Sequence, residues 1–220
     1  MSKAITLLLA LAGAVSVAQA QDAAAGVKKA AMCVGCHGIQ GYQASFPEVH
    51  KVPMIAGQGA KYIVAALGAY KKGERKHPTM RGIAASLSDA DMADLAAFYE
   101  KQGNEKQGSA AAQAMADKPA VAPTAAVAAL LTKGACASCH GANFSKPIDG
   151  GYPKIAGQHA DYLAVALRAY AVQGNPQVGR GNAIMVGQVK QFKREELLAL
   201  AQYIGSLPGE LRTVPQPGLR

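Results

Sequence analysis

The chain contains two copies of one segment, and this internal repeat limits the folds that it can adopt. Residues 55–70, IAGQGAKYIVAALGAY, and residues 155–170, IAGQHADYLAVALRAY, are identical at ten of sixteen positions without a gap. The motif Cys-x-x-Cys-His also occurs twice, at residues 33–37 and 136–140, each time upstream of that segment. Self-similarity at a spacing of about one hundred residues indicates two copies of one small module rather than a solenoid of short repeats. We therefore predict two tandem domains.

Both halves carry helical patterns, and neither shows an alternating strand pattern of useful length. Tyr62 and Tyr70 recur on one face at helical spacing, and Gly73 follows as a helix stop. Ser88 and Asp91 form a predicted capping box at the start of the last helix of the first half. The expected fold class is all-α.

The first twenty residues have the features of a secretory signal peptide. Lys3 precedes an apolar run that ends near Val17, and AQA at residues 18–20 is the small-x-small pattern that signal peptidases cut. The apolar run is too short for a comfortable membrane span and has no basic flank behind it. We predict cleavage after Ala20, export of the chain, and no membrane span in the mature protein. An uncleaved N-terminal anchor is the alternative.

These features divide the chain into four predicted segments. They are a signal peptide at 1–20, a first domain at 21–103, a linker at 104–123 and a second domain at 124–220. The linker is assigned from its content of Ala, Gly, Gln and Pro.

The four cysteines are best explained as sites of covalent haem attachment. A Cys-x-x-Cys disulfide is typical of thioredoxin-like enzymes, which need a βαβ context that the helical patterns do not provide. Zinc sites use more closely spaced pairs and would leave the histidines unexplained. Cys-x-x-Cys-His is the signature of c-type haem, because on a helical turn both thiols and the imidazole share one face. We predict two covalently bound haem c groups, attached to Cys33, Cys36, Cys136 and Cys139, with His37 and His140 as iron ligands.

Haem would also supply apolar interior that the side chains lack, because aromatic residues make up only 5% of the chain and Trp is absent. Each half has one proline at a comparable distance after its motif histidine. Pro53 follows His37 by sixteen residues, and Pro153 follows His140 by thirteen. Each is a candidate to accept a hydrogen bond from the Nδ1–H of its histidine. An equally good interpretation is that each proline only starts the next helix.

The repeat also selects a second iron ligand in each half. Met185 is the only methionine of the second half, and Met80 is its counterpart, each lying eighteen residues before an aromatic residue of the last helix. His50, His77 and His159 have no matched partners. We predict Met80 and Met185 as axial ligands, since His/Met pairing is a known cytochrome c pattern. Two strong axial ligands leave no substrate site, so we expect an electron carrier and not an enzyme; a dihaem enzyme with one open haem is the less favoured alternative.

With these motifs the chain resembles the two-haem class I cytochromes c of the cytochrome c4 type. The resemblance covers the mature chain nearly end to end and rests on the paired CxxCH motifs, the paired P-x-I-A-G-Q helices and the paired methionine loops. It implies two cytochrome c folds, each wrapped around one haem, and periplasmic electron transfer towards a terminal oxidase. The cytochrome subunits of flavocytochrome sulfide dehydrogenases look similar, so an electron-accepting subunit of a periplasmic dehydrogenase is the alternative.

The charge balance bears on the partners. The chain has 23 Lys and Arg against 14 Asp and Glu, a formal net charge of +9. A cluster of four cations precedes Met80: Lys71, Lys72, Arg75 and Lys76. The matching stretch before Met185 contains only Arg180. We expect the cluster to steer the first domain towards an acidic docking surface on a redox protein, an oxidase or a dehydrogenase. We expect no nucleic-acid partner, and at most a loose association with a membrane.

Overall fold

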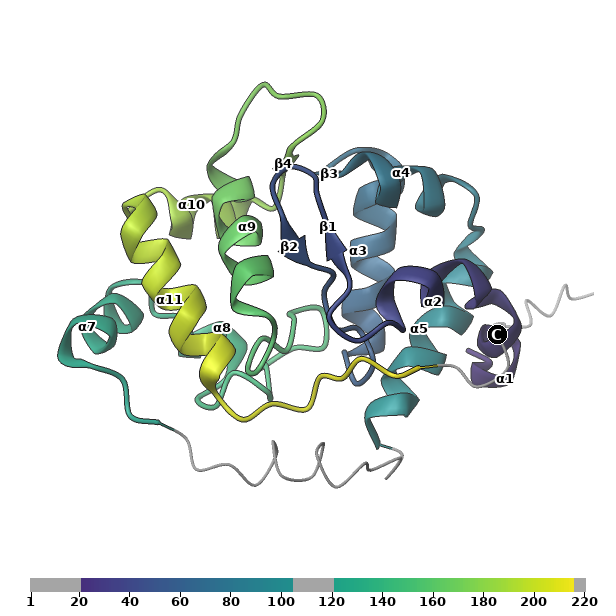
Figure 1. Ribbon diagram of the computed structural model, residues 1–220, viewed down its shortest axis with the longest axis horizontal. Helices are drawn as coiled ribbons and strands as arrows, with labels where there is room; N and C mark the ends of the chain where they lie inside the picture. Colours follow the sequence, from purple (N-terminus) through teal and green to yellow (C-terminus); the bar gives the residue numbers. More distant parts are fainter. Residues whose placement is uncertain (1–20, 105–120, 216–220) are drawn as a thin grey trace, which may run out of the picture.

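The computed structural model describes residues 21–104 and 121–215. Helices dominate, and the helices of the two halves form two groups that lie side by side (Figure 1). The all-α fold with two tandem domains is confirmed. The predicted signal peptide, residues 105–120 of the predicted linker, and residues 216–220 lie outside the described residues.

The first domain begins with two short helices and ends with a long one. Its helices are α1 (Ala23–Lys29), α2 (Ala31–His37), α3 (Ala60–Lys72), α4 (Pro78–Ala85) and α5 (Asp89–Asn104). Its strands are β1 (Gln43–Ala44), β2 (His50–Lys51) and β3 (Arg75–Lys76). Helix α5 extends one residue into the predicted linker.

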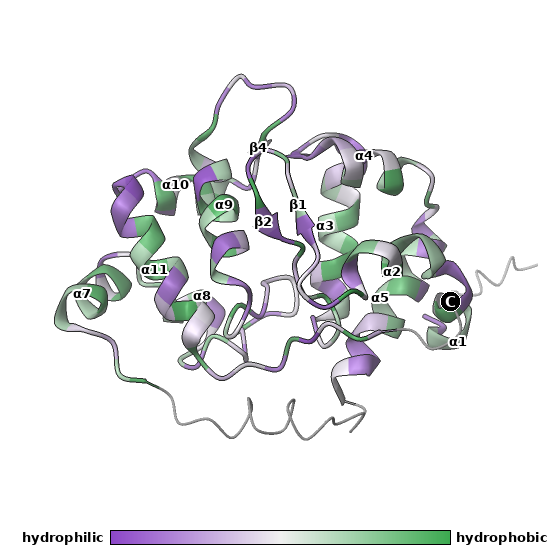
Figure 2. Ribbon diagram, viewed as in Figure 1, coloured by the Kyte–Doolittle hydropathy of each residue, from purple (hydrophilic) through white to green (hydrophobic). Residues whose placement is uncertain are grey.

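The second domain repeats this order. Its helices are α7 (Ala125–Lys133), α8 (Ala137–His140), α9 (Ala160–Ala171), α10 (Ala183–Val189) and α11 (Arg194–Ser206). Its strand is β4 (Gly179–Arg180). Helices α3, α9 and α11 carry both hydrophobic and hydrophilic residues, as amphipathic helices do (Figure 2).

Local signals explain where several helices begin and end. The backbone N–H of Asp91 donates to Ser88 Oγ at 3.2 Å, and the N–H of Ser88 donates to Asp91 Oδ2 at 2.9 Å, so the predicted capping box of α5 is confirmed. Helix α3 ends at Lys72, and the residue after it, Gly73, has a φ of 76° that few other residues adopt without strain. Thr124 caps α7 by accepting a hydrogen bond from the N–H of Val127.

Each domain buries its own apolar core. In the first domain α1 packs across α5, and a Cβ at Gly26 would lie 2.3 Å from the carbonyl oxygen of Asp94, so this crossing needs glycine. The core of this domain contains Met92 and Leu95, which are the largest of the fully buried side chains among the described residues. The second domain has two smaller clusters. One contains Leu163, Ala164, Ala201 and Ile204, and the other contains Phe144, Ala156 and Leu207.

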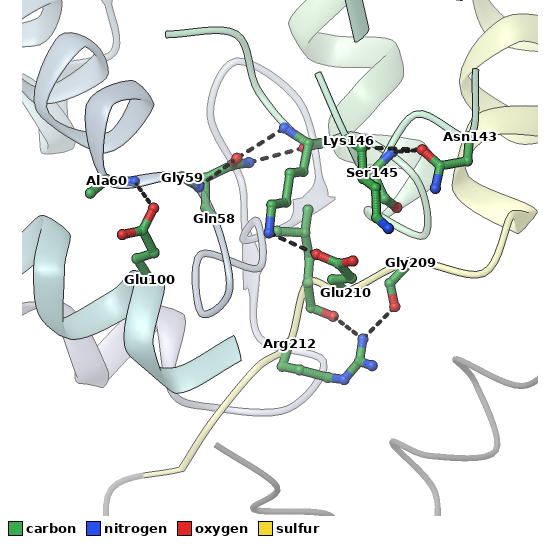
Figure 3. Close-up of polar contacts among 12 residues, drawn as sticks. Gln58, Gly59, Ala60, Glu100, Asn143, Ser145, Lys146, Gly209, Glu210 and Arg212 are labelled. Carbon is green, nitrogen blue, oxygen red and sulfur yellow. Dashed lines mark hydrogen bonds and ion pairs between the residues drawn. The ribbon is translucent and has the colours of Figure 1, made fainter. Parts of the chain in front are cut away.

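The two repeated IAGQ segments join the domains by an exchange of equivalent hydrogen bonds. Gln58 Nε2 donates to the carbonyl oxygen of Lys154 at 2.9 Å, and Gln58 Oε1 accepts from the N–H of Lys154 at 2.9 Å (Figure 3). Gln158 contacts the backbone of Met54 in the same way, at 2.9 and 3.0 Å. Met54 and Lys154 are equivalent positions of the repeat, so this interface has pseudo-twofold symmetry.

Short strands add further contacts between the domains. Strands β3 and β4 pair antiparallel with Arg75 opposite Arg180, so this two-stranded sheet is shared by both domains. The hairpin of β1 and β2 in the first domain reaches α9 of the second, where the N–H of Lys51 donates to Asp161 Oδ2 at 3.0 Å. These strands were not expected from the sequence, because two residues are too few to show an alternating pattern.

The C-terminal segment after α11 runs from the second domain back to the first (Figure 1). The N–H of Arg212 donates to the carbonyl oxygen of Ala56 at 3.0 Å, within the first IAGQ segment. The carboxylate of Glu210 pairs with Lys154 Nζ at 2.7 Å (Figure 3). Val214 packs against the core of the first domain. This segment therefore contacts both domains at the end where the two glutamines meet.

Candidate functional site

The first CxxCH motif lies on helix α2, which ends at His37. Cys33 and Cys36 are one helical turn apart and half-buried, and Cys33 packs against the core of the first domain. Burial raises the pKa of the Cys33 thiol. The two thiols form no disulfide with each other or with another described cysteine. This turn therefore presents two free thiols beside a half-buried imidazole.

The second motif is arranged in the same way around helix α8, with His140 at its last position. Cys136 and Cys139 are half-buried, unpaired thiols. Cys136 packs against the cluster that contains Phe144 and Leu207. Burial also raises the pKa of the Cys136 thiol.

A backbone hydrogen bond fixes the orientation of each motif histidine. His37 Nδ1 lies 2.8 Å from the carbonyl oxygen of Pro53, and His140 Nδ1 lies 3.0 Å from that of Pro153. A carbonyl oxygen can only accept, so Nδ1 carries the proton in both rings and the lone pair remains on Nε2. Burial lowers the pKa of both histidines against the opposing effect of these carbonyls, which favours the neutral form of each ring. The predicted role of the two prolines is confirmed.

The two predicted methionine ligands lie at equivalent places on short helices. Met80 is on α4 and Met185 is on α10, and both are half-buried. The N–H of Met80 donates to His77 Nδ1 at 3.4 Å, and the N–H of Met185 donates to Asn182 Oδ1 at 3.0 Å. Each methionine is thus the third residue after an N-cap, in a first helical turn and not in a loop as expected. Pro78 at the start of α4 is a sequence signal for this turn.

The other described histidines are engaged elsewhere. His77 Nδ1 accepts the cap hydrogen bond from Met80. His50 is buried, and its Nδ1 donates to the carbonyl oxygen of Glu48 at 2.8 Å. His159 precedes α9 as its N-cap residue. His50 and His77 thus have hydrogen-bond partners within the first domain.

The predicted cluster of surface cations is divided in the structure, which corrects the expectation of one docking patch. Because β3 pairs with β4, the side chain of Arg75 lies in the domain interface. Lys76 Nζ donates to the carbonyl oxygen of Asn175 in the second domain at 2.7 Å. Only Lys71 and Lys72 are exposed, and Lys71 Nζ also donates to the carbonyl oxygen of Leu87.

Arg75 and Arg180 meet at the interface among the tyrosines of α3 and α9. Arg75 donates to the hydroxyl of Tyr62 at 3.1 Å and to that of Tyr162 at 2.7 Å, and Arg180 donates to the hydroxyl of Tyr162 at 3.1 Å. Burial alone would raise the pKa of Tyr162, but the two guanidinium charges outweigh it and lower that pKa. Each arginine lies five residues before the candidate methionine of its own half, but this spacing does not indicate that the two side chains meet.

The residues at both motifs fit the attachment of haem. Each motif offers two unpaired thiols and an imidazole whose Nε2 keeps its lone pair. Cys33 and Cys136 lie at the edges of the apolar cores, where a porphyrin attached to them would continue the buried surface. Groups of three or more His, Cys, Asp or Glu that could hold a metal ion without a porphyrin do not occur in residues 21–104 and 121–215.

Comparison with known proteins agrees with this chemistry. The family model described as "Cytochrome c" matches residues 23–103 and again residues 124–208. Cytochrome c4 of Pseudomonas aeruginosa is 32% identical over 212 residues, covering 94% of this chain and 100% of that protein. A "thiosulfate dehydrogenase electron acceptor" of Thiomonas intermedia is 28% identical over 213 residues, covering 92% of this chain and 90% of that protein.

A solved structure has the same arrangement. Reduced recombinant cytochrome c4 from Pseudomonas stutzeri superposes with a TM-score of 0.60 and 29% sequence identity, covering 86% of this chain and 100% of that one. The family match includes both CxxCH motifs, and the relatives extend over both domains. The chain therefore belongs to the cytochrome c family, as a dihaem protein of the cytochrome c4 type with two covalently bound haem c groups.

Proposed function

We propose that this dihaem electron-transfer cytochrome is a periplasmic carrier in which His37 and Met80 ligate one haem iron and His140 and Met185 the other. One observation supports this most strongly. Each domain has a histidine whose Nδ1–H is bonded to a proline carbonyl and a half-buried methionine at equivalent positions of the repeat. Thioether attachment is assigned to Cys33, Cys36, Cys136 and Cys139.

The chain's own residues would keep the coordination constant during electron transfer. Each bound haem supplies an iron that takes up and releases one electron. The carbonyls of Pro53 and Pro153 hold the orientation of the histidine rings, so Nε2 would be the nitrogen offered to a bound iron in either oxidation state. The methionine thioethers favour the reduced iron and raise the potential. Buried cores beside the cysteines limit the entry of water.

We propose that the protein has no catalytic activity of its own, because two axial ligands at each haem leave no site for a substrate. A reductive titration of the purified holoprotein tests this. We expect uptake of two electrons per chain, full reoxidation without loss, and no turnover of hydrogen peroxide or thiosulfate when no partner protein is present. Turnover at a steady rate would favour the dihaem enzyme with one open haem.

The cellular location is proposed from the sequence. The first twenty residues have the pattern of a cleaved signal peptide, which would export the chain to the periplasm. None of the helices in the described ranges combines the length and the apolar character needed to span a membrane. Sequencing the N-terminus of the mature protein should find Gln21; Met1 or Ser2 would indicate an uncleaved anchor.

We propose that redox proteins with acidic surfaces dock on the first domain near Lys71 and Lys72. These cations lie at the end of α3, eight and nine residues before Met80, and both are exposed. Steering by exposed charges accelerates encounter and fades with salt, because screening acts within about 8 Å at physiological ionic strength.

The change Lys71→Glu with Lys72→Glu should slow electron exchange with an acidic oxidase or dehydrogenase at low salt, and added salt should remove the difference. Lys190→Glu, an exposed position of the second domain, is the matched control. Equal slowing by both variants would place docking elsewhere.

A second candidate function is that of an electron-accepting partner of one dehydrogenase. The relative named as a thiosulfate dehydrogenase electron acceptor extends over most of this chain and supports this candidate. A flavocytochrome dehydrogenase is the other candidate donor. Purification from native cells distinguishes these roles from a free carrier, because a dedicated subunit would copurify with its dehydrogenase in constant ratio.

A further inference from the structure

One tyrosine in the core of the first domain has a hydroxyl group without a partner. Tyr99 lies on α5, and only 5% of its surface is exposed. Its phenol oxygen is buried and has no hydrogen-bond partner among residues 21–104 and 121–215. The ring of Phe98, with its centre 5.0 Å away, packs beside it. A buried hydroxyl that lacks a hydrogen bond costs free energy, so this group requires a partner.

The side chain of Cys33 is a neighbour of this hydroxyl. Cys33 packs against the cluster of buried residues to which Tyr99 belongs. Interaction with Cys33 adds to burial in raising the pKa of Tyr99, and Tyr99 in turn opposes the rise that burial causes in the pKa of Cys33. Side chains influence each other through hydrogen bonding only when they are adjacent. The phenol oxygen therefore lies within reach of the sulfur atom.

Attachment of haem changes what this sulfur can do. A thiol can donate or accept a weak hydrogen bond, whereas a thioether sulfur carries no hydrogen and can only accept. The hydroxyl of Tyr99 must then be the donor. The other buried members of the cluster have apolar side chains, such as those of Met92 and Leu95, which offer no better acceptor.

The second domain has no equivalent of this hydroxyl. Tyr99 lies nineteen residues after Met80, and the residue nineteen after Met185 is Ile204, which is also buried. Burial, its own backbone and Cys139 are the causes that shift the pKa of the Cys136 thiol, and no hydroxyl group of the described residues contributes. The two attachment sites are therefore alike in their motifs and differ in this one contact.

We propose that the hydroxyl of Tyr99 donates a hydrogen bond to the thioether sulfur of Cys33 and thereby raises the reduction potential of the first haem and not of the second. The proposal rests on the proposed function, because it takes Cys33 as a point of haem attachment. It does not depend on Met80 or Met185 as iron ligands. Tyr99 acts on the haem through the sulfur and takes no part in ligation of the iron.

The sign of the effect follows from the direction of this hydrogen bond. Reduction adds one negative charge to a haem, and the hydrogen of the donating hydroxyl is the positive end of its dipole. This hydrogen points at a sulfur that is bonded to the haem, so it stabilises the reduced form and raises the potential. The apolar surroundings of Tyr99 strengthen the effect, because they screen it less than water does.

The variant Tyr99→Phe removes the hydroxyl and keeps the aromatic ring. Spectroelectrochemical titration of the full-length holoprotein measures both potentials, and NMR signals assign each potential to its haem. We expect the potential of the first haem to fall and that of the second to stay unchanged. Tyr42→Phe is the matched control, because it removes an exposed hydroxyl of the same domain and should leave both potentials unchanged. An unmoved first potential in Tyr99→Phe, or equal shifts at both haems, would overturn the proposal.

A second measurement separates a hydrogen-bonded hydroxyl from an unpaired one. Removal of a donor that is hydrogen-bonded should lower the denaturant midpoint of the holoprotein, whereas removal of an unpaired buried hydroxyl should leave the midpoint unchanged or raise it. We expect a lower midpoint for Tyr99→Phe than for the wild type. An unchanged or higher midpoint would count against the hydrogen bond and overturn the proposal.

Thiol labelling of the unfolded wild-type holoprotein, with labelled peptides identified by mass spectrometry, tests the attachment of haem to Cys33 separately. We expect no label on Cys33. A labelled Cys33 would overturn the assignment of haem attachment and with it the proposal. An unlabelled Cys33 together with an unmoved first potential in Tyr99→Phe would overturn only the role of Tyr99.

Discussion

At each CxxCH histidine, one backbone hydrogen bond determines which ring nitrogen is available. The carbonyl oxygens of Pro53 and Pro153 hold the Nδ1 protons of His37 and His140, and Nε2 is left as the donor atom. The chain distance between histidine and proline differs in the two halves, sixteen residues against thirteen, yet the contact is the same. The interaction is therefore a shared property of the domains and not of one loop length.

The methionines provide a test at the scale of single residues. Met80→Ala should open one haem of the two, because the alanine side chain cannot reach the iron, and Met185→Ala should open the other. Each variant in the reduced state should then bind carbon monoxide at half of its haems. Met54→Ala is the control, since Met54 meets Gln158 through its backbone, which the substitution preserves. Carbon monoxide binding to Met54→Ala but not to Met80→Ala would contradict the assignment.

Contacts between residues close in the chain were predictable from the sequence, and contacts between distant residues were not. The capping box of Ser88 and Asp91 was predictable, because both partners lie within four residues. The prediction that Arg75 belongs to an exposed surface was wrong, because the neighbouring Lys71, Lys72 and Lys76 make the segment resemble a solvated cationic surface. Its partner Tyr162 is 87 residues away in the chain, and no local pattern indicates such a contact.

Among the elements, α1 and α5 show how packing and charge combine. Lys29 on α1 pairs with Asp91 and Asp94 on α5, at 2.7 Å in each case. The N–H of Asp22 also donates to Asp94 Oδ1 at 2.9 Å. The hydrogen bond from Lys29 and then that from Asp22 lower the pKa of the Asp94 carboxyl below its ordinary value of 3.8. Together these contacts connect the start of the first domain to its last helix.

This carboxyl group predicts a pH dependence of stability. Its pKa is lower in the folded protein, so its contribution is complete above about pH 4 and is lost as the pH falls through the folded-state pKa. Asp94→Asn should lower the thermal midpoint near neutral pH, and the difference from wild type should shrink as the pH falls through the folded-state pKa. Thermal unfolding followed by circular dichroism measures both. Asp89→Asn, an exposed residue at the start of the same helix, should have a smaller effect. A pH-independent difference for Asp94→Asn would exclude this mechanism.

Helices and strands differed in how well the sequence indicated them. The long helices α3 and α5 follow apolar periodicity and end signals such as Gly73. Helices α4 and α10 were expected to be loops, because helices this short contain too few apolar repeats to show a helical period. Pro78 and Asn182 are nevertheless signals for the start of a helix. Strands β3 and β4 form only when the two domains meet, so neither half of the sequence indicates them alone.

For the whole molecule, the equivalent glutamines Gln58 and Gln158 define how the domains meet. Each satisfies both the N–H and the carbonyl of one residue in the opposite domain. The C-terminal segment crosses the same end of the interface, with Arg212 bonded to Ala56. The repeat was evident in the sequence, but an exchanged hydrogen bond needs the relative placement of the domains, which a repeat does not specify.

Removal of one of these glutamine side chains should lower the free energy of unfolding of the protein. Gln58→Ala leaves the N–H and carbonyl of Lys154 without their partner, at a cost of about 1–3 kcal/mol of stability. Gln158→Ala should act alike at Met54. Chemical denaturation of the holoprotein measures the change, and Gln173→Ala, an exposed residue after α9, is the control. Stabilities of Gln58→Ala and Gln173→Ala that coincide would mean that the exchanged contacts contribute nothing to the interface.

The central claim is that both haems have histidine and methionine as axial ligands and that the protein therefore only transfers electrons. The weak far-red absorption of a methionine–iron bond in the oxidised, full-length holoprotein tests it most directly, measured per haem by comparison with a one-haem His/Met cytochrome. We predict an intensity that corresponds to two such bonds per chain. An intensity that corresponds to one bond, or to none, would contradict the claim. It would mean that at least one haem lacks a methionine ligand and could bind a substrate.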